Sequence, residues 1–135
     1  MAIELLVVCE WEGPLLKQTP FLHPKWEQIE AAIRSLNGQE RNDLYLVPQA
    51  RVRETYLAVG GGDGGFLVTG SISGVEFPTY VNASRPVEPR RLLMVGGQEG
   101  DYPGNWILDL VEALDAVRVF FTGGGFSACS SWPRT

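Results

Sequence analysis

The sequence contains few of the side chains that bind metal ions or act as nucleophiles. Its 135 residues include two cysteines and one histidine, whereas a structural zinc site takes four cysteine or histidine ligands. Cys9 and Cys129 lie near opposite ends of the chain, and we expect two free thiols because no export signal accompanies them. His23 has no nucleophile beside it in the sequence. We therefore expect no catalytic residue, no metal ion and no cofactor, and a protein that is not an enzyme.

Long apolar runs and an excess of basic charge are also missing. No run approaches the roughly 18 residues that a membrane-spanning helix needs. Residues 1–12 lack the basic start and the cleavage site of an export signal, so we expect a cytoplasmic protein. The 11 Lys and Arg against 16 Asp and Glu give a net charge of −5, which disfavours direct binding to nucleic acid. Such a surface suits either solvent or a basic partner.

Glycine and proline, by contrast, are plentiful, with 16 and 9 residues. Most of the glycines fall at the ends of apolar runs, which favours many short strands joined by tight turns. A chain of 135 residues is long enough to bury a core without disulfides or metal. We expect residues 1–135 to form a single domain.

The first third of the chain predicts a strand, a loop and a helix. Residues Ile3–Trp11 are β-branched or large and apolar, and Gly13-Pro14 ends this strand. We expect a loop to follow, because prolines recur in it up to Pro24, which suits the first position of a helix. Apolar residues then recur at helical spacing up to Asn37-Gly38, at Trp26, Ile29, Ile33 and Leu36.

The middle of the chain predicts further strands at residues 44–47, 54–59 and 66–72, with an edge strand at Val75–Val81 that contains Pro78. The glycines of Gly60–Gly65 have the spacing of a dinucleotide-binding loop. That loop needs a helix after it, however, and here a strand follows. We therefore interpret Gly60–Gly65 as the tip of a hairpin.

Residues 91–123 combine a strand with the second helix. Leu92–Val95 predicts a buried strand, Gly96-Gly97 a turn, and the acidic residues that follow a polar loop. Asn105 is a good N-cap for a helix that Gly123 ends. The predicted buried stripe of this helix is Ile107, Leu110, Val111, Leu114, Val117 and Phe121. The whole pattern predicts an α+β fold: an antiparallel sheet of about five to six strands with two helices packed on one face.

Several residues also occur in an order that resembles a known family. They are Trp26 and Leu36 at the ends of the first helix, Tyr45, Tyr56, Gly60-Gly61, Gly96-Gly97-Gln98, Asn105, Asp109, Ala113, Leu114, Ala116, Phe120 to Gly123, and Trp132. In this respect the chain resembles the immunity proteins that neutralise deaminase toxins in bacterial polymorphic toxin systems, specifically the first immunity family described for them.

The resemblance implies a small α+β protein without enzymatic activity. Such a protein binds a cognate toxin and occludes its active site or substrate groove. An acidic inhibitor would be steered electrostatically toward the basic groove of a toxin that modifies nucleic acid. For contacts with the toxin we expect Asp63, at the hairpin tip, and Glu99, Asp101 and Tyr102, before the second helix. Glu10 and Glu12 are a second choice.

Two other functions remain open from the sequence. The chain fits a module that binds a small ligand or a peptide, with residues Gly96–Asn105 as a lid over a sheet cavity. It also fits a structural subunit that forms a homodimer through the predicted edge strand Val75–Val81.

Overall fold

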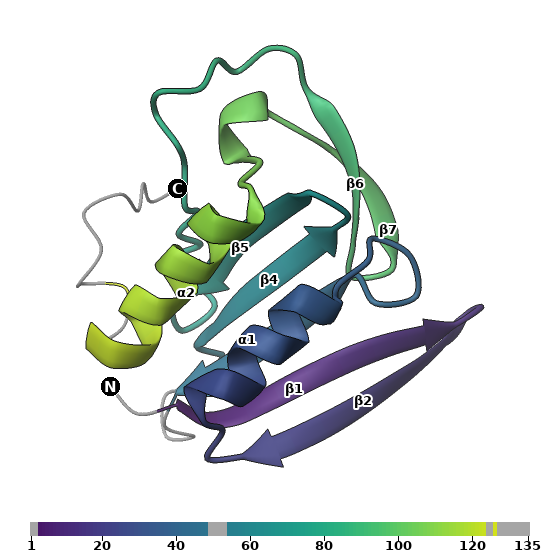
Figure 1. Ribbon diagram of the computed structural model, residues 1–135, viewed down its shortest axis with the longest axis vertical. Helices are drawn as coiled ribbons and strands as arrows, with labels where there is room; N and C mark the ends of the chain where they lie inside the picture. The colour runs from purple at the N-terminus through teal and green to yellow at the C-terminus, as the bar shows by residue number, and fades with distance from the viewer. Residues whose placement is uncertain (1–2, 49–53, 124–125, 127–135) are drawn as a thin grey trace.

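A computed structural model of the chain describes residues 3–48, 54–123 and 126. A five-stranded antiparallel sheet in the order β2-β1-β3-β4-β5 carries both helices on one face (Figure 1). Its strands are β1 (Ile3–Glu12), β2 (Leu15–Leu22), β3 (Asp43–Pro48), β4 (Tyr56–Gly62) and β5 (Gly65–Ser71), and the helices are α1 (Trp26–Ser35) and α2 (Leu110–Gly123). A separate two-stranded sheet consists of β6 (Arg91–Val95) and β7 (Gln98–Tyr102), and a 3-10 helix spans Gly104–Trp106. The predicted α+β fold is confirmed.

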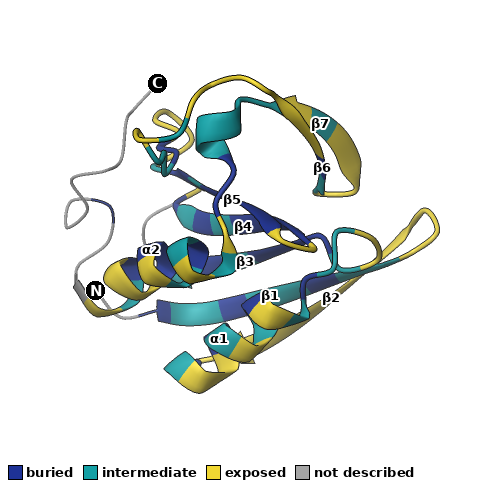
Figure 2. Ribbon diagram, turned by 45° about the horizontal axis from the view of Figure 1, so that its top comes forward, coloured by how far each residue is buried: buried dark blue, intermediate teal, exposed yellow. Residues whose placement is uncertain are grey.

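The core lies between the five-stranded sheet and the two helices. Ile29 and Ile33 of α1 and Phe120 of α2 pack against alternate residues of β1, β3, β4 and β5. Figure 2 shows that the outer faces of both helices are exposed while the strips toward the sheet are buried. Trp26 is half-buried at the edge of this core, with its ring 5.8 Å from that of Phe121. Cys129 and Trp132 lie outside the described residues.

The predicted hairpin at Gly60–Gly65 is confirmed. Asp63 and Gly64 form a two-residue turn with φ values of 54° and 82°. Two successive positive φ angles match the twist of an antiparallel hairpin, and aspartate followed by glycine is a preferred sequence for such a turn.

Residues 15–22, which we predicted to be a loop, form the edge strand β2. All eight residues pair with β1, from Leu15 opposite Glu12 to Leu22 opposite Leu5. The prediction was wrong because it took Pro20 as a loop signal. A proline cannot donate a hydrogen bond from its backbone, but an edge strand has one side on which no such bond is needed.

The prediction of an edge strand at Val75–Val81 is also wrong. The segment makes only isolated bridges to the preceding strand, Ile72 with Glu76 and Thr69 with Thr79. Backbone bonds from Gly70 to Pro78 and from Tyr80 to Val68, of 2.8 and 2.9 Å, attach it to the outer edge of β5. The segment therefore covers the edge strand β5 instead of forming a strand that a second copy would extend.

Residues 98–102, predicted as a polar loop, form β7. Leu92–Val95 is a strand as predicted, but it belongs to this small sheet, and Leu92 is 61% exposed. The two strands pair from Arg91 opposite Tyr102 to Val95 opposite Gln98. This hairpin buries only one of its two faces. Strand β6 is therefore not buried along its whole length, and β7, although mostly polar in sequence, has both exposed and partly buried residues.

Helix α2 begins later than predicted. Its predicted stripe is confirmed at Val117, which is buried, and at Leu110, Leu114 and Phe121, which pack partly buried against the core, but it is wrong at Val111. Asn105 lies in the 3-10 helix, and the cap belongs to Asp109: its Oδ1 accepts from the Glu112 amide at 2.8 Å, while the Asp109 amide donates to Glu112 Oε1 at 2.9 Å. This is a reciprocal capping box. The buried residues are Ala113, Ala116, Val117 and Phe120, while Val111 is 67% exposed. Small alanines let the helix approach the sheet, and a search for large apolar residues misses them. Helix α1 likewise begins at Trp26 and not at Pro24.

This register of α2 predicts unequal effects of two substitutions in the same helix. Phe120→Ala removes a ring that is 1% exposed and lies 4.9 Å from that of Phe126. We expect a loss of about 3–5 kcal/mol in the free energy of unfolding. Val111→Ala, the matched control, should change it by less than about 0.5 kcal/mol. Urea denaturation of both variants measures the difference, and equal losses would contradict the register.

Candidate functional site: an acidic rim at one end of the sheet

Three segments meet at Asn42 at one end of the five-stranded sheet. This residue is 2% exposed. Its Nδ2 donates to the carbonyl of Gln39 at 2.7 Å, and its Oδ1 accepts from the Gly97 amide at 3.0 Å. Its own carbonyl accepts from the Gly61 amide at 2.9 Å. One buried residue therefore connects the α1–β3 loop, the β4–β5 hairpin and the β6–β7 turn.

Glycines allow the same segments to approach closely. A Cβ atom on Gly62, whose φ is 128°, would lie 2.5 Å from the backbone nitrogen of Gly38 after α1. One on Gly60 would lie 2.4 Å from a methyl carbon of Val95 in β6. One on Gly97 would lie 2.5 Å from the indole ring of Trp11, which brings the end of β1 to the same place. The β6–β7 hairpin is thus fixed across the ends of β4, β3 and β1.

Exposed carboxylates lie on the segments that meet at this junction. We define the acidic rim as Glu12, Glu40, Asp63 and Glu99, one from each converging segment and all exposed. The sequence analysis singled out three of them and missed Glu40. The carbonyl of Glu40 accepts from the Trp11 amide at 2.7 Å, and its carboxylate accepts from Asn37 Nδ2 at 3.0 Å. Hydrogen bonds from its own backbone and from Asn37 hold the pKa of Glu40 below its usual value. Glu40 is therefore ionised at neutral pH.

The other predicted contact residues are placed differently. Asp101 lies near the far end of β7, where its Oδ2 is 3.0 Å from Nε of Arg90, so its charge is partly neutralised. Tyr102 is half-buried against the cluster of Leu67, Leu93 and Ile107. Glu10 is half-buried on β1 opposite Lys17. Since the compensating charge of Arg90 is 11 positions from Asp101 in the sequence, no local pattern reveals that ion pair.

An apolar spot lies beside the rim. Leu92 and Met94 point to the same face of the small sheet as Asp101 and Glu99, because directly opposite residues of paired strands share a face. A hollow of about 170 Å³ separates these two side chains from the β4–β5 turn with Asp63 and from Gln39. Arg91 also lines this hollow, so the surface combines negative charge and two apolar side chains with one guanidinium group.

Two ionisable groups beneath the junction, the Tyr45 phenol and the Cys9 thiol, have raised pKa values. Burial, followed by the neighbouring carboxylate of Asp43, raises the pKa of the Tyr45 phenol, which bonds to that carboxylate. Burial also raises the pKa of the Cys9 thiol, which has no exposed surface. A neutral, buried thiol is a poor nucleophile. His23 lies exposed in the turn after β2.

Two further searches cover residues 3–48, 54–123 and 126. Within them, no group of three or more histidine, cysteine or acidic side chains is placed to hold a metal ion. None of the helices in the same residues combines the length and the apolar character that crossing a membrane requires.

The fold and the rim together define an α+β protein with an acidic surface built on a rigid junction. Comparison of the chain with protein-family models, curated protein sequences and solved structures finds no match in any of the three. The resemblance to deaminase-toxin immunity proteins stays a prediction that rests on the residues named above.

The role of Asn42 predicts a loss of stability when its side chain is truncated. Asn42→Ala removes both hydrogen bonds of the buried Asn42 amide, each worth about 0.5–1.5 kcal/mol net, so we expect a loss of roughly 1–3 kcal/mol in the free energy of unfolding. Gln39→Ala is the control, because only the backbone carbonyl of Gln39 bonds to Asn42. We expect that variant to stay within about 0.5 kcal/mol of the parent. Denaturant unfolding provides the comparison, and a neutral Asn42→Ala would show that the junction does not depend on this amide.

Proposed function

We propose that this chain is an immunity protein that binds a cognate nucleic-acid deaminase toxin and blocks its active site or substrate groove. The observation that carries the proposal is the acidic rim, in which exposed carboxylates from four separate segments lie at one end of the sheet. A toxin that acts on nucleic acid needs a basic groove, and a clustered negative surface accelerates encounter with such a groove and orients the complex. The proposed activity is binding alone, exercised in the cytoplasm.

The surroundings of the rim also suit a protein interface. Leu92 and Met94 supply an apolar centre, and charged residues surround it, as in interfaces whose anchors are apolar and whose periphery is polar. The hydrogen bonds of Asn42 and the close glycine contacts hold the four segments in place before binding. A surface that is already ordered loses less conformational entropy on association, which favours tight binding.

A ligand-binding module with residues 96–105 as its lid is a weaker alternative. Most of the proposed lid is β7 and its turn, which the Gly97–Asn42 hydrogen bond attaches to the sheet. A lid must open with little cost, and this segment has no unpaired hinge of that kind.

Charge reversal at the rim tests the proposal. A tagged chain is used to recover partners from native cell lysate, and the partners are identified by mass spectrometry. We expect a stoichiometric partner with a zinc-deaminase signature. In the double variant Glu12→Lys and Glu99→Lys, recovery should fall at least about fivefold, equivalent to about 1 kcal/mol, with an unchanged melting temperature. Asp63 is left intact because its positive φ favours a short polar residue.

The matched control is Glu27→Lys with Asp115→Lys, which changes the net charge equally but alters exposed residues of the two helices. This variant should retain the partner. Equal loss in both double variants would show that net charge alone causes the effect and that the rim is not part of the interface. A partner without the deaminase signature, or no stoichiometric partner, would contradict the proposed function itself.

A further inference from the structure

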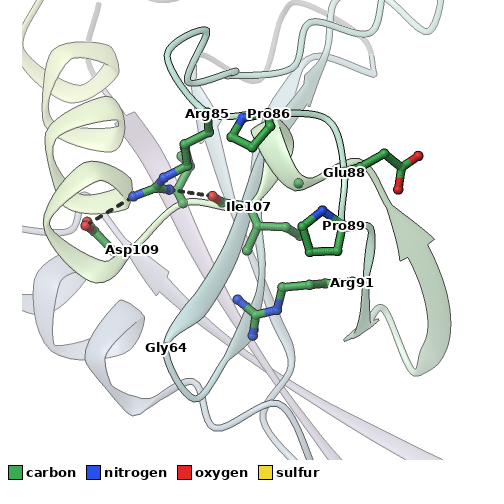
Figure 3. Close-up of a pocket in the computed structure, with 10 residues that line it drawn as sticks. Gly64, Arg85, Pro86, Glu88, Pro89, Arg91, Ile107 and Asp109 are labelled. Atoms are coloured by element: carbon green, nitrogen blue, oxygen red, sulfur yellow. Dashed lines mark hydrogen bonds and ion pairs between the residues drawn. The ribbon is translucent and has the colours of Figure 1, made fainter.

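A second concave site lies between β6, the segment 82–90, the 3-10 helix and the start of β5 (Figure 3). Its volume is about 290 Å³. Pro86, Pro89 and Ile107 provide apolar wall, and Arg85 and Arg91 bring two guanidinium groups to it. The pocket is at the lower end of the size range of small-molecule sites, so it suits a small ligand.

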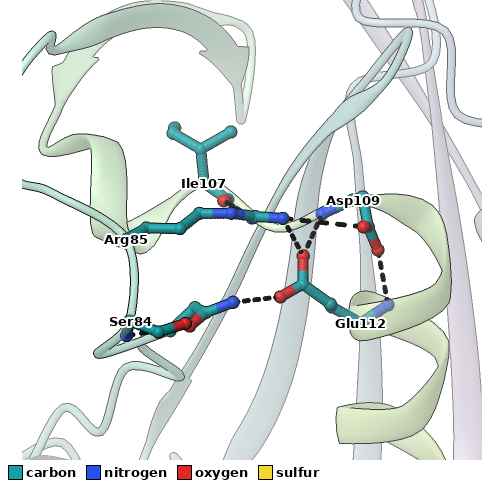
Figure 4. Close-up of polar contacts among 6 residues, drawn as sticks. Ser84, Arg85, Ile107, Asp109 and Glu112 are labelled. Carbon is teal, nitrogen blue, oxygen red and sulfur yellow. Dashed lines mark hydrogen bonds and ion pairs between the residues drawn. The ribbon is translucent and has the colours of Figure 1, made fainter.

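The charge of Arg85 is already compensated. Its Nη2 lies 2.6 Å from Glu112 Oε1 and 3.6 Å from Asp109 Oδ2, and its Nη1 donates to the carbonyl of Ile107 at 2.7 Å (Figure 4). Asn82 donates to the other oxygen of Glu112. Arg85 therefore attaches the segment 82–90 to the start of α2, and its guanidinium has little capacity left for a ligand.

Arg91 has no such partner. Within the described residues its side chain makes no hydrogen bond and no ion pair, whereas Arg90 beside it bonds to Asp101. The guanidinium of Arg91 lies over Gly65, where an added Cβ atom would be 3.0 Å from Nη2. In Figure 3 it points into the pocket, whereas the carboxylate of Glu88 points away from it. The pocket thus contains one uncompensated positive charge in a chain of net charge −5.

We propose that this pocket binds a small carboxylic acid with an apolar body. The carboxylate pairs with the planar fork of Arg91, which matches a carboxylate through two parallel hydrogen bonds. The body of the ligand lies against Pro86, Pro89 and Ile107. A single negative charge fits best, because one free guanidinium balances one charge. A second charge, as on inorganic phosphate, would face Asp109 without a partner.

Titration with sodium benzoate tests the site. Amide resonances of the ¹⁵N-labelled full chain are followed by NMR at constant ionic strength, and inorganic phosphate is titrated in a second experiment. We expect saturable shifts at Gly64, Gly65 and Leu108 with benzoate, with roughly millimolar affinity because so small a ligand has few interacting atoms. Phosphate should produce no saturable shift at the same amides.

Four variants locate the carboxylate. Arg91→Gln should weaken benzoate binding at least about tenfold, and Arg91→Lys, which retains the charge without the fork, should weaken it several-fold. Gly65→Ala should also weaken it, because the new methyl group displaces the flexible end of Arg91. Arg90→Gln is the matched control, since it removes the preceding arginine, which bonds to Asp101 and does not line the pocket, and its binding should equal that of the parent.

Three results would overturn the proposal. They are no saturable shift with benzoate in the folded parent, equal binding by Arg91→Gln and the parent, and saturation by phosphate with an affinity similar to that of benzoate. None of these results depends on a protein partner, so the pocket and the proposed immunity function fail or succeed independently.

Discussion

The end of the sheet depends on the two hydrogen bonds of the buried amide group of Asn42. An isolated polar group in this position would be strongly destabilising, but here its donor and its acceptor are both used, one by Gln39 and the other by Gly97. Because these partners belong to segments far apart in the sequence, satisfying one amide also fixes their relative position. The β6–β7 hairpin contributes little core of its own, so this connection and the packing of Trp11 on Gly97 keep it against the sheet.

The hairpin turn explains only some of the glycines at residues 60–65. The turn itself needs Asp63 and Gly64, whose φ angles are positive. Gly60, Gly62 and Gly65 serve contacts with other elements: Val95 of β6, the end of α1, and the guanidinium of Arg91. Each glycine loses more backbone entropy on folding than a residue with a side chain would. The contacts that their small size permits offset this cost, and both candidate sites depend on them.

Local pattern was enough to predict strands β1, β3, β4 and β5, the first helix and the hairpin turn, because each has a clear period and its own end signals. It failed where tertiary position decides. Pro20 is compatible with a strand only at the edge of a sheet, and Ala113 and Ala116 become core residues only because the helix lies close to the sheet. The sequence contains the capping-box pair Asp109 and Glu112, but Asn105 was predicted as the N-cap. For the rim, the neighbouring turn residues predicted that Glu12, Asp63 and Glu99 are exposed. Only the fold shows that these residues lie at the same end of the sheet.

The sequence of β6, Arg-Leu-Leu-Met-Val, led to a wrong prediction of burial because the two faces of the strand lie in different environments. Successive side chains of a strand point to opposite faces. One face carries Leu93 and Val95 into the small cluster with Leu67 and places Arg91 over Gly65; the other presents Leu92 and Met94 beside the acidic rim. An apolar run of this kind normally indicates a strand buried on both sides. Here one side is buried and the other is exposed. Arg91, at the start of the strand, lines both the carboxylate pocket and the hollow beside the acidic rim, so the two candidate sites are neighbours that share one guanidinium group.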